Sequence, residues 1–453
     1  MHESGCGPVR SPRRSAGAAC LGRHETPPLD PWLRNFLAVW PGLFAVSAGL
    51  TAVLPTLPFF LEETFGIEDP EQARLWAGLV FAAGPLTSAL VGPVWGVVGD
   101  RYGRKPMVLR SMLAIAVVNG LMPFAPGVGW LVALRAVQGL LAGYVAPAIA
   151  LVTAEAPAQR QGLVIARLQL AMALGMLLGP AIGAEASAWF GRAQVFHVTA
   201  ILCLLATVPV VAFAREDRKL PRGASGLAGV GAALRDDLGA LLGNRVFLGL
   251  LAWIFVMRIG QNMIEPMLAL WIRELGPLPW LRVGSETDLH VLDRTTALAF
   301  MAVAVAQFLC TPMWGRLADR YGPLRVLAVD ALGLGVCYVA TVFVPGIEVF
   351  LLVRFASALF MSGSMTLAYA AGSKLMSAER RSLAFSAVQS CIQFGLSFGP
   401  IFAASVAGVL PLRTLFGVAG ACLLVAGVGM LWLRRLGSVE PRPDAPRPVE
   451  ETP

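Results

Sequence analysis

The chain has 453 residues, of which 56% are hydrophobic and only 14% are charged, and its formal net charge is +8. A soluble globular domain carries about 25% charged residues, so a deficit of this size over the whole length excludes an ordinary soluble protein. Apolar runs of about 18 residues or more recur along the chain, and each is long enough to cross a bilayer. The composition therefore predicts a polytopic membrane protein.

Residues 1–35 lack the apolar stretch and cleavage site of a secretory signal, so we expect a disordered tail there. Twelve apolar runs follow. Six lie in 36–214 and begin near Phe36, Leu75, Val108, Trp130, Ile165 and Phe196. A basic linker at 215–246 separates them from six more in 247–436, which begin near Phe247, Thr296, Val326, Phe350, Leu383 and Leu412. With a second disordered tail at 437–453, the pattern predicts an all-α membrane protein of twelve transmembrane helices in two six-helix halves.

Basic residues predict the orientation of these helices. Most of the 36 lysines and arginines fall in the two tails, the linker and the alternate loops that share a side with them. Cytoplasmic loops of membrane proteins are rich in Lys and Arg, so we expect both termini in the cytoplasm of a bacterial plasma membrane. Anionic membrane lipids then account for the positive charge, and no nucleic-acid partner is needed.

Motifs for catalysis are absent from the sequence. It has no Walker-type phosphate-binding loop, and its four histidines (His2, His24, His197 and His290) lack metal-ligand spacing. No Cys/His or Ser/His/Asp grouping suggests a catalytic site. We therefore expect neither an enzyme nor an ATP-driven pump with its own ATPase, and no cofactor or metal.

One charged turn occurs twice. Residues 93–104 read PVWGVVGDRYGR and residues 312–322 read PMWGRLADRYG, 219 positions later. Charge bias alone would not repeat Pro, Trp, Gly, Asp, Arg, Tyr and Gly in register, so the repeat indicates a duplicated half. The glycines that open the two turns, Gly96 and Gly315, are expected to let a neighbouring helix approach closely.

The first copy places Gly96, Asp100, Arg101, Gly103, Arg104 and Lys105 in the pattern G-x-x-x-D-R-x-G-R-K, and the second keeps Gly315, Asp319, Arg320 and Gly322. This pattern resembles the signature loop of the major facilitator superfamily, and the resemblance covers nearly all of 36–436. It implies alternating access around one central cavity. It also implies that the loop is a conformational latch, which contacts helix eleven and stabilises the outward-facing state.

Helices four and ten each contain an arginine, Arg135 and Arg354, again 219 positions apart. A buried arginine in a membrane helix is costly and suggests a function. The segment with Arg135, Gln138 and Gly139 resembles the superfamily motif associated with proton coupling. The alternative is that Arg135 only reaches the interface or holds a backbone carbonyl.

Helix five carries Gly175, Gly179, Pro180 and Gly183 in the segment GMLLGPAIG. The small residues form a face suited to close helix packing, and the proline can bend the helix. The segment resembles the motif associated with antiporters, and helix eleven repeats it in part. The resemblance favours an exporter of the twelve-helix drug:proton antiporter branch over an importer.

Helix seven is the main candidate for the site of chemistry. Its residues Arg258, Gln261, Asn262 and Glu265 are spaced to share one helical face, and Pro266 predicts an irregular helix there. We expect Glu265 and Arg135 to couple protons. The substrate cavity is expected to involve Arg258, Gln261 and Asn262, together with Gln169, Gln389 and Gln393 from other helices. Two alternatives stay open: Glu265 pairs structurally with Arg258, or Arg258 receives an anionic substrate.

Other carboxylates receive lesser roles: Glu62 and Glu63 would mark the membrane interface, and Asp330 would pair with the nearby Arg325. The sequence thus predicts a monomeric, proton-coupled exporter of small amphiphilic drugs or metabolites, with small-molecule cargo, protons and membrane lipids as partners. The alternatives are a proton-coupled importer of a sugar, organic acid or peptide, and a lysolipid transporter.

Overall fold

The computed structural model describes residues 30–67, 69–157, 160–216, 239, 243–282, 287–376, 381–406 and 410–436. Within these ranges all regular structure is helical, and twelve helical segments are long and apolar enough to cross a membrane. The fold class predicted from the sequence is thereby confirmed. The predicted N-terminal tail apart from 30–35, the whole predicted C-terminal tail and most of the predicted linker at 215–246 lie outside the described residues.

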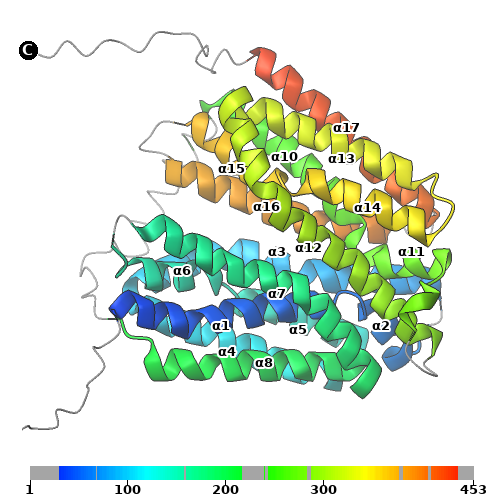
Figure 1. Cartoon of the computed structure of the whole chain (residues 1–453), viewed down its shortest axis with the longest axis horizontal. Helices are drawn as coiled ribbons and strands as arrows, with labels where there is room; N and C mark the ends of the chain where they lie inside the picture. The colour runs from blue at the N-terminus through cyan, green and yellow to red at the C-terminus, as the bar shows by residue number, and fades with distance from the viewer. Residues whose placement is uncertain are drawn as a thin grey trace, which may run out of the picture.

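Two bundles form the molecule (Figure 1). The first holds α1 (Pro31–Ala52), α2 (Leu57–Phe65), α3 (Pro70–Tyr102), α4 (Arg104–Leu121), α5 (Val128–Leu141), α6 (Val145–Thr153), α7 (Gln161–Phe190) and α8 (Arg192–Phe213). The second holds α10 (Arg245–Met263), η3 (Glu265–Met267), α11 (Leu268–Leu275), α12 (Asp288–Tyr321), α13 (Pro323–Thr341), α14 (Ile347–Met361), α15 (Ser364–Lys374), α16 (Arg381–Ser405) and α17 (Leu412–Leu436). We call them the N half and the C half.

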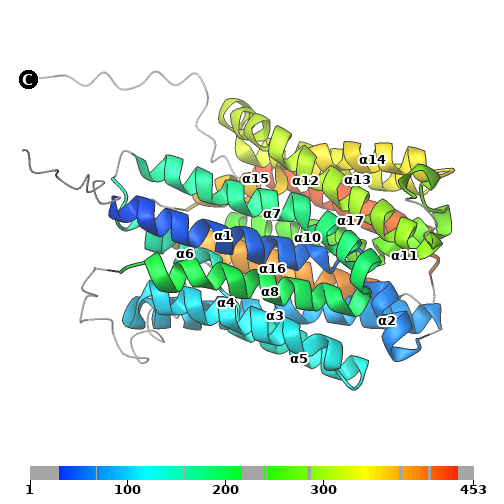
Figure 2. The same ribbon diagram turned by 60° about the horizontal axis from the view of Figure 1, so that its bottom comes forward.

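The helices run roughly parallel to one long direction, and α1 begins at the same end of the molecule at which α17 ends (Figures 1 and 2). We call this the terminal end, and the opposite end, which carries α2 and α11, the α2 end. The halves meet where α3 packs against α16 and α7 against α12. Helix α1 begins five residues before the expected Phe36, because Pro31 is compatible with the first turn of a helix, where its missing N–H leaves no bond unmade.

Three spans that the sequence presents as single apolar runs are broken. The fourth consists of α5 and α6, the tenth of α14 and α15, and the seventh of α10, η3 and α11. The break in the seventh lies at Pro266, as expected. Helices α14 and α15 begin 219 positions after α5 and α6, so the duplication seen in the charged turn extends to the position of the break.

In both copies of the repeated turn, the tryptophan donates a hydrogen bond to the helix that ends at the break in the fourth or the tenth span. The indole Nε1 of Trp95 donates to the carbonyl oxygen of Leu140 at 2.7 Å, and that of Trp314 to the carbonyl of Leu359 at 2.8 Å. Each carbonyl lies in the last turn before the break, where no helical N–H follows to bond it. The spacing of 45 residues is the same in both pairs, and the shared role explains why tryptophan occurs in both copies of the turn.

Glycines of α7 let it lie directly against α1. A Cβ added at Gly175 would lie 2.5 Å from the carbonyl oxygen of Phe44, and one at Gly183 would lie 1.9 Å from that of Ala52. Gly395 and Gly399 on α16 meet α10 in the same way, at the Cβ of Arg258 and the carbonyl of Ile259. The small-residue face predicted on helix five therefore packs backbone against backbone.

This contact yields a prediction. Gly183→Ala should lower the melting temperature and the transport rate, because the added methyl meets backbone that cannot swing aside as a side chain can. The matched control is Gly162→Ala on the same helix, where a Cβ meets nothing within 4 Å. Thermal unfolding of both purified variants tests the prediction. Equal melting temperatures for the two variants would contradict the packing role.

Candidate functional site

Glu265 lies at the junction of the halves and is paired with an arginine. It begins η3, which packs against α2 and α3 of the N half. Its Oε1 accepts from Nη2 of Arg354 on α14 at 2.8 Å, and the two side chains are 11% and 2% exposed. Nε and Nη1 of Arg354 are buried and donate no hydrogen bond of standard geometry among the described residues, so Glu265 supplies the anion for this cation. The structure thus joins Glu265 to Arg354, and not to Arg258 or Arg135.

The residues predicted to share one face of α10 make different kinds of contact. Nη1 of Arg258 donates to Oε1 of Gln261 at 2.7 Å, and the buried amide of Gln261 reaches across to Ser364 on α15. The amide of Asn262 donates back to the carbonyl of Arg258 at 2.7 Å. Arg258 and Gln261 therefore belong to an interhelical polar network, whereas Asn262 bonds within its own helix.

The remaining candidates lie apart from this network. Arg135 on α5 is buried, donates to Oε1 of Gln138 at 3.1 Å and lies 5.9 Å from the ring centre of Phe196. Gln389 accepts from the hydroxyl of Tyr369. The other two glutamines are the exposed Gln169 on α7 and the half-buried Gln393 on α16.

Asp330 differs from its expected role. It is fully buried on α13 and accepts from the hydroxyl of Ser364 at 2.6 Å, whereas Arg325 is exposed. The expected pair fails because residues five apart point to different faces of an α-helix. Asp330 is therefore a buried carboxylate in the middle of the C half that sequence proximity misassigned.

The signature loop has its best-defined contacts within the N half. The backbone N–H groups of Arg104 and Lys105 donate to the carboxylate of Glu216 at 2.9 and 3.0 Å, which stabilises the N-terminus of α4. Nη1 of Arg104 donates to the carbonyl of Ala150 at 2.7 Å. Gly103 has φ +100°, a backbone conformation that favours glycine.

The other residues of the predicted latch make few contacts that the structure describes. Gly96, Asp100 and Arg101 belong to α3, but their side chains lie outside the described part of the molecule. In the second copy Asp319 and Arg320 are exposed, and a Cβ at Gly315 would meet no atom within 4 Å. The close helix approach expected at Gly315 does not occur in this structure.

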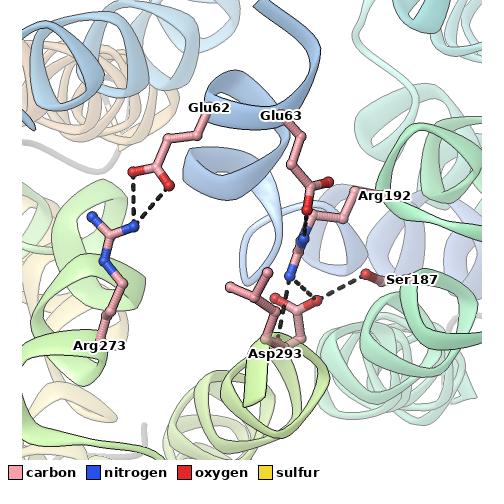
Figure 3. A network of polar contacts seen from close by, with 7 residues as sticks. Glu62, Glu63, Ser187, Arg192, Arg273 and Asp293 are labelled. Carbon is pink, nitrogen blue, oxygen red and sulfur yellow. Dashed lines mark hydrogen bonds and ion pairs between the residues drawn. The ribbon is translucent and has the colours of Figure 1, made fainter. Parts of the chain in front are cut away.

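A network at the α2 end joins the two halves through buried charges (Figure 3). Arg192, at the start of α8, is 5% exposed and its Nη2 lies 3.0 Å from Oδ2 of Asp293 on α12, which is fully buried. The hydroxyl of Ser187 on α7 donates to the same oxygen at 2.8 Å. Arg192 also pairs with Glu63 on α2 and donates to the carbonyl of Leu289 at 3.4 Å.

Further ion pairs cross between the halves beside this network. Nη1 of Arg273 on α11 lies 2.7 Å from Glu62 on α2, as Figure 3 also shows. The other two are Arg294 with Glu185 at 2.7 Å and Arg74 with Glu274 at 3.6 Å. Glu62 and Glu63 thus do more than mark an interface: with Arg192, Asp293 and their neighbours they hold the halves together at the α2 end. We call these four cross-half pairs, with Ser187 and Glu63, the α2-end clasp.

Sequence reasoning missed Arg192 and Asp293 because they are about a hundred positions apart and lie on helices of different halves. A signal was available, since Asp293 falls five residues into α12 near an apolar stretch, where a carboxylate without a partner would be costly. Finding its partner required the three-dimensional arrangement of α7, α8 and α12.

A twelve-span duplicated bundle, with charged residues buried inside each half and a clasp at one end, defines a transporter that moves solutes across a membrane. The model of the Major Facilitator Superfamily matches residues 39–285 and 260–453. The chain belongs to this superfamily: it is a multi-pass inner-membrane transporter of small molecules and not an enzyme.

Relatives with similar sequences carry names of efflux proteins. A multi-drug resistance efflux pump PmrA homolog of Lactococcus lactis subsp. lactis is 30% identical over 407 residues, which are 88% of this chain and 94% of that protein. A multidrug resistance protein MdtG of Serratia proteamaculans is 31% identical over 411 residues, 90% of this chain and 95% of that one.

Solved structures with the same fold include transporters of other solutes. A peptide transporter POT in complex with sulfate superimposes with a TM-score of 0.68 at 15% identity, covering 89% of this chain and 94% of that one. A bacterial homolog of the lysosomal transporter Spinster, in an inward-facing and occupied conformation, gives 0.67 at 14%, covering 89% and 96%. At such identities the likeness establishes the fold alone.

Proposed function

We propose that the protein is a proton-coupled exporter of small amphiphilic drugs or metabolites that works as a monomer by alternating access. The observation that carries this proposal is the Arg354–Glu265 pair, a nearly dry carboxylate at the break of the seventh span, where the halves meet. When a proton binds to the carboxylate there, its ion pair with the arginine is released. The break in the helix is a point at which the backbone can bend. The names of the relatives supply the direction of transport and the class of cargo.

The terminal end faces the cytoplasm in this proposal. Basic residues at that end greatly outnumber those at the α2 end. At the α2 end, moreover, five arginines are balanced by carboxylates: Arg74, Arg192, Arg273, Arg282 and Arg294. The clasp then closes the external side, and the structure represents an inward-facing state. Protons enter from outside when the clasp is open, displace Arg354 from Glu265 and leave to the cytoplasm as cargo moves outward.

Inside-out membrane vesicles test this function. Uptake of ethidium into vesicles that contain the full chain should require an imposed proton gradient, acid inside, and should stop when a protonophore is added. Glu265→Gln should reduce gradient-driven uptake at least tenfold, since an amide cannot exchange a proton at neutral pH. Vesicles without the protein are the control, and uptake that persists in the variant without a gradient would refute the coupling role.

The nutrient-importer alternative predicts a different result. A nutrient importer would accumulate its solute in whole cells under a proton gradient, and whole-cell ethidium would not change when the chain is expressed. Solved structures of a peptide transporter and of a D-xylose-proton symporter share the fold, but they bear on the architecture only.

A further inference from the structure

A chain of hydrogen bonds through two neutral side chains, Gln261 and Ser364, links Arg258 on α10 to Asp330 on α13. Nη1 of Arg258 donates to Oε1 of Gln261 at 2.7 Å. Nε2 of Gln261 donates to the hydroxyl of Ser364 at 2.7 Å, and that hydroxyl donates to Oδ2 of Asp330 at 2.6 Å. Tyr338 holds the middle of the chain, because its hydroxyl donates to the carbonyl oxygen of Gln261 at 3.3 Å.

The direction of these hydrogen bonds is fixed by chemistry. A guanidinium can only donate, so Gln261 must present its oxygen to Arg258 and its NH₂ group to Ser364. The hydroxyl of Ser364 then accepts from Gln261 and gives its single proton to Asp330. Every bond points from the cation to the carboxylate, so each dipole favours a positive charge at one end and a negative charge at the other.

Neither charge at the ends of the chain has a direct ionic partner among the described residues. Asp330 is fully buried and its Oδ1 has no hydrogen bond, and Nε of Arg258 is likewise buried without a partner. In the neighbouring pair, the charges of Arg354 and Glu265 compensate each other.

The other elements packed against α13 offer no alternative counter-charge. Their described charged side chains toward the terminal end are exposed: Arg316, Asp319 and Arg320 on α12, Lys374 on α15, and Arg434 and Arg435 on α17. A buried charge is costly unless an opposite charge compensates it. Arg258 and Asp330 are therefore compensated by each other, through two neutral residues.

We propose that Asp330 is the remote counter-charge and positioning residue of Arg258, and that it sets the preference of the transport site between cationic and anionic cargo. The inference rests on the proposed function, because it takes Arg258 on the broken seventh span to face the cargo. With Asp330 in place, the guanidinium is held against Gln261 and its charge is offset. Without Asp330, the same site carries an unbalanced positive charge.

Two probes of one shape and opposite charge, tetraphenylphosphonium and tetraphenylborate, separate this effect from a general loss of binding. Isothermal titration with the purified full chain gives a Kd for each. Asp330→Asn should weaken the cation and strengthen the anion by about tenfold each, and so shift the ratio of the two affinities by at least about a hundredfold toward the anion, as expected for one unit charge about 10 Å away at an effective dielectric constant of about 20. Arg258→Gln should shift it toward the cation.

The double variant, Arg258→Gln with Asp330→Asn, removes both charges and should return the ratio close to that of the wild type. Ser364→Ala keeps both charges but breaks the chain, so the freed guanidinium should give a smaller shift than Asp330→Asn. Equal weakening of both probes in Asp330→Asn, or a double variant as shifted as either single one, would overturn the proposal.

Thermal unfolding measured without cargo separates this inference from the proposed function. If the wild type bound neither probe, the drug-transport proposal would fail, but thermal unfolding of the wild type, Asp330→Asn, Arg258→Gln and the double variant would still test the pair. Each single variant should melt several degrees below the wild type, and the double variant should recover most of the loss. Additive losses of melting temperature would show that Arg258 and Asp330 are independent, and would refute their coupling.

Discussion

Asp293→Asn is expected to open the α2 end of the molecule. The side chain of Asp293 is fully buried in the clasp, and its charge is balanced by Arg192, which is itself 5% exposed. Removing one member of a buried ion pair typically costs about 3–5 kcal/mol, because the other charge is left without compensation. Arg192 keeps Glu63 as a partner, so we expect about 2–3 kcal/mol here.

This cost falls on one conformation only. In the state in which the halves separate at the α2 end, both side chains reach water and the substitution matters little. The ratio of open to closed molecules should therefore rise about 30- to 150-fold. Hydrogen exchange measured by mass spectrometry should show faster exchange in the last turn of α7 and the first turns of α12, with unchanged exchange in α4 and α13.

A matched control lies in the same clasp. Arg273→Gln breaks the pair with Glu62, whose side chains are 39% and 26% exposed. Partly exposed pairs contribute about 0.2–1 kcal/mol, so the shift should stay below about fivefold. If Arg273→Gln opened the α2 end as much as Asp293→Asn, burial would not be what makes the Asp293 contact strong, and our account of the clasp would be wrong.

The contrast between the fold and the clasp shows what a single sequence can convey. Apolar runs, their lengths and the turn repeated after 219 residues report local and periodic properties, so twelve spans and two halves could be predicted from them. The position of the break in the seventh span was readable for the same reason, since Pro266 acts on its own backbone. The breaks in the fourth and tenth spans contain no proline but only a glycine each, Gly143 and Gly363, which is a weaker local signal.

Partners of buried charges were not readable, because they depend on which helix faces are brought together. Glu265 has Arg258 seven residues away in sequence, yet it pairs with Arg354, 89 positions later. Asp330 has Arg325 close by, yet it receives its hydrogen bond from Ser364. In both cases the nearer arginine is in a different environment from the carboxylate: Arg325 is exposed, and Arg258 is held by Gln261.

The second large effect concerns the pair of Arg354 and Glu265. Arg354→Gln should destabilise the protein by about 3–5 kcal/mol, because it leaves Glu265 in a nearly dry site without its cation. Glu265→Gln should do the same to Arg354, for which Glu265 is the ionic partner among the described residues. The double variant, in which both side chains become neutral amides of similar shape, should recover at least half of the lost stability.

In the double variant, the melting temperature and the proton-coupled uptake should respond differently. If Glu265 carries the proton, the double variant should recover at least half of the lost stability yet remain at least tenfold slower in gradient-driven ethidium uptake, because it still lacks a group that exchanges protons. A purely structural bridge predicts the reverse: once the two charges are removed together, uptake should recover along with the melting temperature. The pair is thus a direct test of whether a buried charge at the broken seventh span exists to hold the fold or to be released within it.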